Sequence, residues 1–151
     1  MKKLAAIVCL VVSFAFLAGM AFAGEGDVGK AEALVKKGVA YYNANGEDKA
    51  LEEFSNPKGE FVEGELYLFM VDFSGITLAH GGNPDIIGKN MKGLKDADGK
   101  LFIQEMIDVA KTKGSGWVDY KWKNPKTGEL TAKSSYVEKL GDAFIGCGIY
   151  K

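Results

Sequence analysis

The stretch that decides the fold is Gly114–Lys151, GSGWVDYKWKNPKTGELTAKSSYVEKLGDAFIGCGIYK. It contains three runs rich in aromatic and β-branched residues, which are typical of strands. The runs are 117–123, 131–140 and 143–150, and the turn signals Asn124–Gly128 and Gly141–Asp142 separate them. Connections this short join neighbouring antiparallel strands. The stretch therefore predicts three consecutive antiparallel strands.

Two more strands are predicted upstream of this stretch. Leu66–Val71 is a continuous apolar run, which favours a strand covered on both faces. Ser74–Gly75 then turns the chain into a partner strand, Ile76–His80. Residues 81–97 are rich in Gly, Asn, Asp and Lys and predict a loop with one helical turn.

Helices are predicted on either side of the upstream strands. Apolar residues recur at three- and four-residue steps over 28–45, and a shorter helix follows over 47–55. A third helix is predicted over 99–112, with Asp98 as its N-cap. The fold class is therefore α+β, with helices packed on a five-stranded antiparallel sheet in one domain.

The first 23 residues have the three parts of a secretory signal peptide. Met1–Lys3 is positive, Leu4–Leu17 is apolar, and Ala21–Ala23 is an Ala-x-Ala cleavage site. Cleavage after Ala23 would leave residues 24–151 as an exported domain, periplasmic or secreted. The alternative is a retained membrane anchor, because residues 4–23 carry no charge and are about long enough to span a bilayer.

The composition excludes several classes of function. Lys2 and Lys3 precede the cleavage site, so 17 of the 19 basic residues remain against 20 acidic ones, a formal charge of −3. Nucleic-acid binding needs a basic face instead. The one histidine and the one cysteine beyond Ala23 are too few for a disulfide or an ordinary zinc site. We therefore expect no nucleic acid, no metal, no cofactor and no enzymatic activity.

Every one of the 19 basic residues is a lysine. A bound anion cannot then be held by the bidentate fork of an arginine guanidinium. It would have to be held by Lys, by backbone N–H groups, or by Ser, Tyr and Trp donors.

Several runs in order resemble one known family, the extracellular single Cache domain of type 2. The runs are Leu66–Gly75 with Leu78–His80, Ile87–Met91, Gly114–Trp122, Lys133–Val137 and Gly146–Tyr150. The resemblance covers about residues 30–151 and implies a PAS-like sheet behind a long N-terminal helix. It also implies a sensor domain that binds small organic ligands, typically acetate, propionate, lactate or pyruvate.

The resemblance gives the candidate site residues a role. Trp117, Tyr120 and Trp122 are either core aromatics or the wall of a pocket, and strand alternation places Trp117 on the face opposite the other two. In the next strand, Lys133 and Ser135 share one face, and Tyr136 lies on the other.

Four positions have both a structural and a functional interpretation. Lys133 is the leading candidate for the counter-ion of a carboxylate, although most lysines are solvated. His80 is either a structural residue or a ligand donor at the pocket rim. Gly146 and Gly148 either allow close packing or leave backbone amides free for a ligand, and Cys147 between them is expected to be a buried, unreactive thiol.

We expect an exported domain that captures a small organic acid between the sheet and residues 81–97. Occupancy would be relayed to a separate membrane receptor or sensor kinase, in signal transduction or chemotaxis. The first alternative is a ligand-free interaction module, in which the N-terminal helix packs in a homodimer or on a receptor. The second, an enzyme, lacks a recognisable catalytic constellation.

Overall fold

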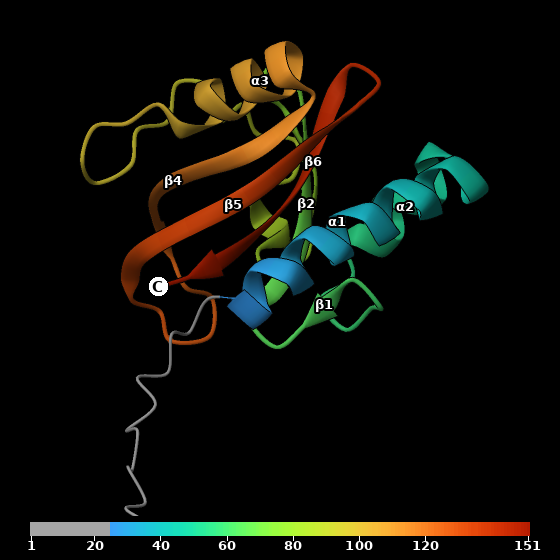
Figure 1. Cartoon of the computed structure of the whole chain (residues 1–151), viewed down its shortest axis with the longest axis horizontal. Coiled ribbons are helices and arrows are strands. Elements are labelled where there is room, and N and C mark those ends of the chain that lie inside the picture. The colour runs from blue at the N-terminus through green and yellow to red at the C-terminus, as the bar shows by residue number, and fades with distance from the viewer. Residues whose placement is uncertain (1–24) are drawn as a thin grey trace, which may run out of the picture.

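A six-stranded antiparallel sheet with helices on both faces forms the described part of the protein (Figure 1). The computed structural model describes residues 25–151, and the predicted signal peptide lies outside them. The helices are α1 (Glu25–Asn45), α2 (Glu47–Phe54) and α3 (Phe102–Lys113), with the 3-10 turn η1 (Pro84–Ile86). The strands are β1 (Val62–Glu63), β2 (Leu66–Asp72), β3 (Thr77–His80), β4 (Ser115–Lys123), β5 (Leu130–Leu140) and β6 (Ala143–Tyr150).

The three strands predicted from the C-terminal stretch are present as consecutive antiparallel neighbours, β4, β5 and β6. The last of them also pairs with β2, so that the order across the sheet is β3, β2, β6, β5, β4. The two-residue strand β1, which pairs with the start of β2, was not predicted. β2 and β6 are therefore central, and this explains why both are apolar nearly throughout.

Alternation along the strands divides the core into two clusters. On one face, Met70, Ile145 and Cys147 pack with residues of α1 and α2. On the other face, Phe69 and Phe144 pack with α3. Figure 1 shows α3 on the opposite side of the sheet from α1 and α2.

Helix α3 is present, but it begins at Phe102 and not at the predicted residue 99, and it lacks the predicted N-cap. Leu101 occupies the cap position without a side-chain hydrogen bond, and the Asp98 side chain does not cap the helix. The neighbouring Asp96 instead accepts backbone N–H bonds from Asp98, Lys100 and Lys121 at 2.9–3.0 Å. These bonds, that of Lys100 first, lower the pKa of Asp96. Asp96 therefore fixes the loop before α3 to the edge strand β4.

A register shift in β3 changes which side chains share a face. Met70 is opposite Ala79, but the next residue, Val71, is opposite Thr77, so Leu78 is an extra residue in β3. A bulge of this kind breaks the two-residue alternation. Thr77 and His80 consequently both lie opposite residues of the α3 face, Val71 and Phe69.

No helix within residues 25–151 combines the length and the apolar character needed to cross a membrane.

Candidate ligand-binding site

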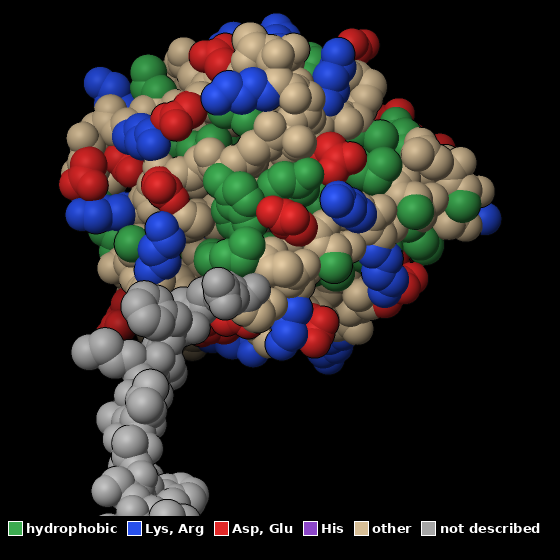
Figure 2. Space-filling model, in the orientation of Figure 1, with side chains coloured by type: hydrophobic (Ala, Val, Ile, Leu, Met, Phe, Trp, Pro, Cys, Tyr) green, Lys and Arg blue, Asp and Glu red, His purple; other side chains and the backbone are tan. Residues whose placement is uncertain are grey.

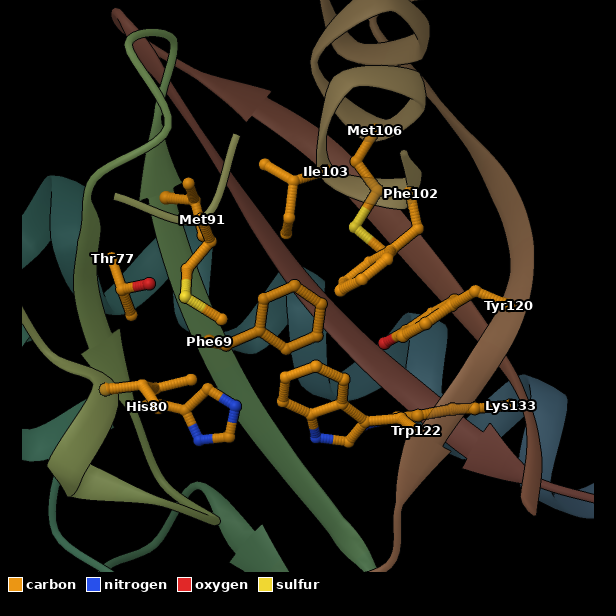
Figure 3. A pocket seen from close by; sticks show the side chains of 12 residues that line it. Phe69, Thr77, His80, Met91, Phe102, Ile103, Met106, Tyr120, Trp122 and Lys133 are labelled. Atoms are coloured by element: carbon orange, nitrogen blue, oxygen red, sulfur yellow. The ribbon is translucent and has the colours of Figure 1, made fainter. Parts of the chain in front are cut away.

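A cavity lies between the sheet and α3 (Figure 3). Its lining comes from β2 (Phe69, Val71), β3 (Thr77, His80), the following loop (Ile86, Met91), α3 (Phe102, Ile103, Met106), β4 (Tyr120, Trp122) and β5 (Lys133). The volume open to the centre of a water molecule is about 20 Å³. This is room for roughly one water. The lining is mostly apolar, with a few polar groups, as in most small-molecule sites.

Lys133 is the cation of the cavity and is only 2% exposed. Its Nζ donates to Tyr67 Oη at 2.6 Å and to Tyr150 Oη at 3.3 Å. The side chain passes over Gly148 of β6, where a Cβ would lie 2.3 Å from Lys133 Cε. The absence of a side chain at this glycine therefore provides the space in which the lysine side chain passes over β6.

The charge of Lys133 has no carboxylate partner among residues 25–151. The faces of Tyr67 and Tyr150 lie 4.3 and 4.7 Å from Nζ and compensate for part of the lost hydration. Burial nevertheless lowers the lysine pKa from 10.5 to about 7. A buried cation without a counter-ion is destabilising, and a bound anion would relieve that cost.

His80 is a neutral hydrogen-bond donor at the wall of the cavity. Its Nδ1 accepts backbone N–H bonds from Gly82 at 3.2 Å and Asn83 at 2.8 Å, so the proton of the neutral ring is on Nε2. Burial, and then the charge of Lys133, lower the pKa of His80 to about 3. Figure 3 shows the imidazole pointing from β3 toward the cavity. The backbone N–H groups of Gly82 and Asn83 thus set the tautomer of the ring.

Tyr120 closes another side of the cavity and is held by two contacts. Its hydroxyl is 2.9 Å from Ser135 Oγ, and its ring stacks on that of Phe102 with centroids 4.6 Å apart. Burial raises the pKa of Tyr120, so the phenol stays neutral. The ring of Trp122 meets Phe102 edge-on at 5.5 Å. These aromatics join β4 to the first turn of α3.

The structure brings together most of the residues proposed from the sequence. His80, Tyr120, Trp122 and Lys133 line the cavity, and Ser135 lies behind Tyr120.

Trp117 and Tyr136 lie on the opposite face of the sheet, as alternation requires, and do not line the cavity. The Trp117 indole N–H donates to Glu32 Oε1 of α1 at 3.1 Å, and the Tyr136 ring packs beside Trp117 at 5.7 Å. These two residues therefore contribute to the α1 interface.

Gly146 and Gly148 do not offer free amides, because both lie in the paired central strand. A Cβ at Gly146 would lie 2.6 Å from the Phe69 ring, so the close-packing interpretation holds. Cys147 points to the α1 face and is fully buried. Burial raises the pKa of its thiol to about 12, in agreement with an unreactive cysteine.

Three polar residues of the site were missed in the sequence. Tyr67 and Tyr150, whose hydroxyls are 2.9 Å apart, hold the lysine. Their positions in buried strands were a signal, since a buried phenol needs a partner. Thr77 gave a misleading signal, because strict alternation places it on the face away from His80.

An antiparallel sheet with helices on both faces is also the fold of solved sensor domains of chemotaxis proteins. The family model of the single Cache domain 2 matches residues 30–151. The chain belongs to this family, whose members serve as sensory ligand-binding domains.

Relatives of this chain occur in receptors and kinases. Methyl-accepting chemotaxis protein McpP of Pseudomonas putida is 30% identical over 86 residues, which are 56% of this chain and 16% of that protein. Sensor histidine kinase MctS of Rhizobium johnstonii is 36% identical over 86 residues, 56% of this chain and 18% of the kinase. The chain therefore matches less than a fifth of the length of either relative.

Solved structures show the same fold. A methyl-accepting chemotaxis protein from Vibrio parahaemolyticus superposes with a TM-score of 0.71 at 26% identity, over 83% of this chain and 88% of the other. A periplasmic sensor domain of a chemotaxis protein superposes with a TM-score of 0.65 at 28% identity, over 83% of this chain and 90% of the other. A Cache chemosensory domain described for carboxylic acid recognition superposes with a TM-score of 0.64 at 26% identity, over 83% of this chain and 88% of the other.

Proposed function

We propose that this chain is an exported sensor domain that binds a short carboxylate in the cavity under α3. The observation that carries the proposal is Lys133, a buried ammonium group with no carboxylate partner among the described residues. The Nε2–H of His80 is a second donor facing the same space. Together they offer two donors to the two oxygens of one carboxylate. The similarity to a domain described for carboxylic acid recognition supports this ligand class.

We expect ligand binding to enlarge the cavity, because the centre of a water molecule can reach only about 20 Å³ of it, which is room for roughly one water. Met91 and Met106 are the side chains best suited to move, since methionine is unbranched and adapts its shape. Figure 3 shows both extending into the cavity, one from the loop and one from α3. Occupancy would therefore shift these two segments, and their outer surfaces would present the change to a membrane receptor or sensor kinase.

Titration calorimetry of the purified protein with acetate, propionate, lactate and pyruvate tests the proposal. We expect at least one acid to bind and Lys133→Met to weaken it at least about a hundredfold, because losing a buried charge partner costs roughly 3–5 kcal/mol. Lys139→Met is the matched control, since Lys139 is an exposed lysine on the same strand. Absence of heat with every acid, or equal binding by both variants, would contradict the proposed site.

The alternative is a ligand-free interaction or dimerisation module, and the small cavity is the observation that favours it. Figure 2 also shows hydrophobic side chains gathered where α1 crosses the sheet, among interspersed charges of both signs. One measurement distinguishes the two functions. A ligand that binds only the folded state raises the melting temperature. A melting temperature that none of the acids raises would favour the interaction module.

A further inference from the structure

Thr77 carries a hydroxyl without a partner at the wall of the cavity. Among the described residues, its Oγ1 is the sole buried side-chain nitrogen or oxygen with no hydrogen bond. The residue is 2% exposed and lines the cavity. Figure 3 shows the hydroxyl on the side that faces the cavity. Since buried polar groups are nearly always paired in native proteins, this one calls for an explanation.

The backbone of Thr77 is fixed on both edges. Its N–H donates to Lys89 O at 3.0 Å, and its carbonyl accepts from Gly88 N–H at 2.8 Å. On the other edge, Thr77 is opposite Val71 of β2. These backbone pairings on both edges fix the position of the side chain at the cavity. The bulge at Leu78 places it on the same face of the sheet as His80.

Apolar side chains surround the hydroxyl. From the elements facing β3, the lining of the cavity includes Phe69, Val71, Met91 and Ile103, and Val71 lies opposite Thr77 in the sheet. The other polar lining groups are Lys133 and His80, to which we assign the carboxylate, the Tyr120 hydroxyl, which is already bonded to Ser135, and the Trp122 indole N–H, which can donate but not accept. The Thr77 hydroxyl is therefore left for a different atom of the ligand.

We infer that Thr77 determines specificity by hydrogen bonding to an oxygen substituent on the ligand's carbon chain. The ligand class is then the short hydroxy or oxo monocarboxylic acids, in preference to unsubstituted acids of the same length. A hydroxyl can both donate and accept, so Thr77 suits a hydroxy and an oxo group alike. A second carboxylate is disfavoured, because Lys133 is the only lysine that the described residues contribute to the lining. This inference rests on the proposed function and refines its ligand class.

Calorimetry with propionate, lactate, pyruvate and 3-hydroxypropionate tests the inference. The wild type should bind the best oxygenated acid at least about tenfold more tightly than propionate, the scale of one hydrogen bond and its desolvation penalty. Thr77→Val should bring this ratio below about threefold by weakening the oxygenated acids, and leave propionate nearly unchanged. Thr77→Ser, which keeps the hydroxyl, should retain the preference.

Two controls separate specificity from folding. Thr112→Val removes a threonine hydroxyl on the outer side of α3 and should leave the ratio unchanged. Thr77→Val should melt no lower than the wild type, since the lost hydroxyl has no partner among the described residues.

The outcomes also distinguish this inference from the proposed function. Equal wild-type affinity for propionate and the oxygenated acids, as expected if Thr77 bonds only to a cavity water, would overturn the inference. A preference that persists in Thr77→Val would overturn it too. In both cases binding that is lost in Lys133→Met leaves the proposed function standing. If the wild type binds neither these four acids nor acetate, both the inference and the proposed function fall.

Discussion

Lys133 has opposite effects on folding and on ligand binding. Its side chain is buried with two phenol hydroxyls and without an acidic partner in the described chain, so the charged form is poorly solvated. An anion would pair with that same charge. The residue that weakens the free domain is therefore the one expected to make binding strong, a combination common at functional sites.

This conflict predicts how ligand affinity depends on pH. With a pKa of about 7, Lys133 loses its charge as the pH rises through neutrality, whereas a carboxylate needs the charged form. The groups facing it are Tyr67 and Tyr150, which stay neutral because burial raises the pKa of each, and His80, whose pKa of about 3 keeps it neutral as well. Affinity should fall by up to about tenfold per unit between pH 7 and 9. Calorimetry at pH 6, 7, 8 and 9 measures this, and a flat profile would contradict it.

The stability of the free protein should change in the opposite direction. The pKa of Lys133 is 10.5 when it is exposed and about 7 when folded, so the unfolded chain binds more protons between these values. Stability from this group therefore rises with pH from about 7 to 10.5 and is lost as the pH falls back to 7. Denaturant unfolding across this range checks the sign, and Lys133→Met should remove the contribution.

At the scale of elements, glycines in β6 leave space beside that strand, and the Lys133 side chain of β5 occupies part of it. Gly146 and Gly148 leave room on the α3 face for the Phe69 ring and for Lys133, while Ile145 and Cys147 fill the α1 face. The alternation of glycine with apolar residues thus makes one strand flat on one side and packed on the other. The Lys133 side chain extends over the flat side of β6 to reach Tyr67.

Gly148→Ala is therefore predicted to damage the site. The new Cβ would lie 2.3 Å from both Lys133 Cε and Ser135 Oγ, so both side chains must move. We expect a loss of about 1–3 kcal/mol of stability, the usual cost of overpacking, and at least about tenfold weaker ligand binding. Urea unfolding and calorimetry measure the two effects.

Gly93→Ala is the control for this prediction, because nothing lies within 4 Å of a Cβ at Gly93. The stability cost of Gly148→Ala should also shrink in a Lys133→Ala background, where the clashing carbon is gone. A cost that is unchanged in that background would show that the lysine is not the group displaced.

At the scale of the whole molecule, the two faces of the sheet differ in what packs against them. The α3 face contains the cavity, and the α1 face contains the interface that Trp117 and Tyr136 form with the long helix. β2 and β6 contribute side chains to both faces, so the cavity and α1 pack against opposite sides of the same two strands. If a ligand occupies the cavity as proposed, these two strands are the part of the sheet that it shares with the helix.

The predicted signal peptide leads to a prediction about the whole chain. If the signal peptide is removed after Ala23, intact mass spectrometry of the protein purified from its native source should give the mass of residues 24–151. The same measurement under native conditions should show an additional mass of a short organic acid, which disappears in Lys133→Met. A full-length mass of the membrane-extracted protein would favour the retained anchor instead.

Much of the fold was readable in the sequence because its signals are local. The turns at Asn124–Gly128 and Gly141–Asp142 and the apolar run at Leu66 determine where strands begin and end. Alternation within β4 and β5 placed Tyr120 and Trp122 apart from Trp117, and Lys133 apart from Tyr136, as the structure has them. The two-residue period of a strand is a property of the backbone and needs no tertiary information.

Only the tertiary structure decided which face holds the cavity and what completes it. The sequence contains no signal for the bulge at Leu78, which arises from the register between β2 and β3 and brings Thr77 beside His80. Nor could it pair Lys133 with Tyr67, 66 residues away, because that contact depends on β6 lying between their strands. Local periodicity determined the elements of this protein. Its proposed specificity depends on the register and pairing of distant strands, which are set by the packing of the whole sheet.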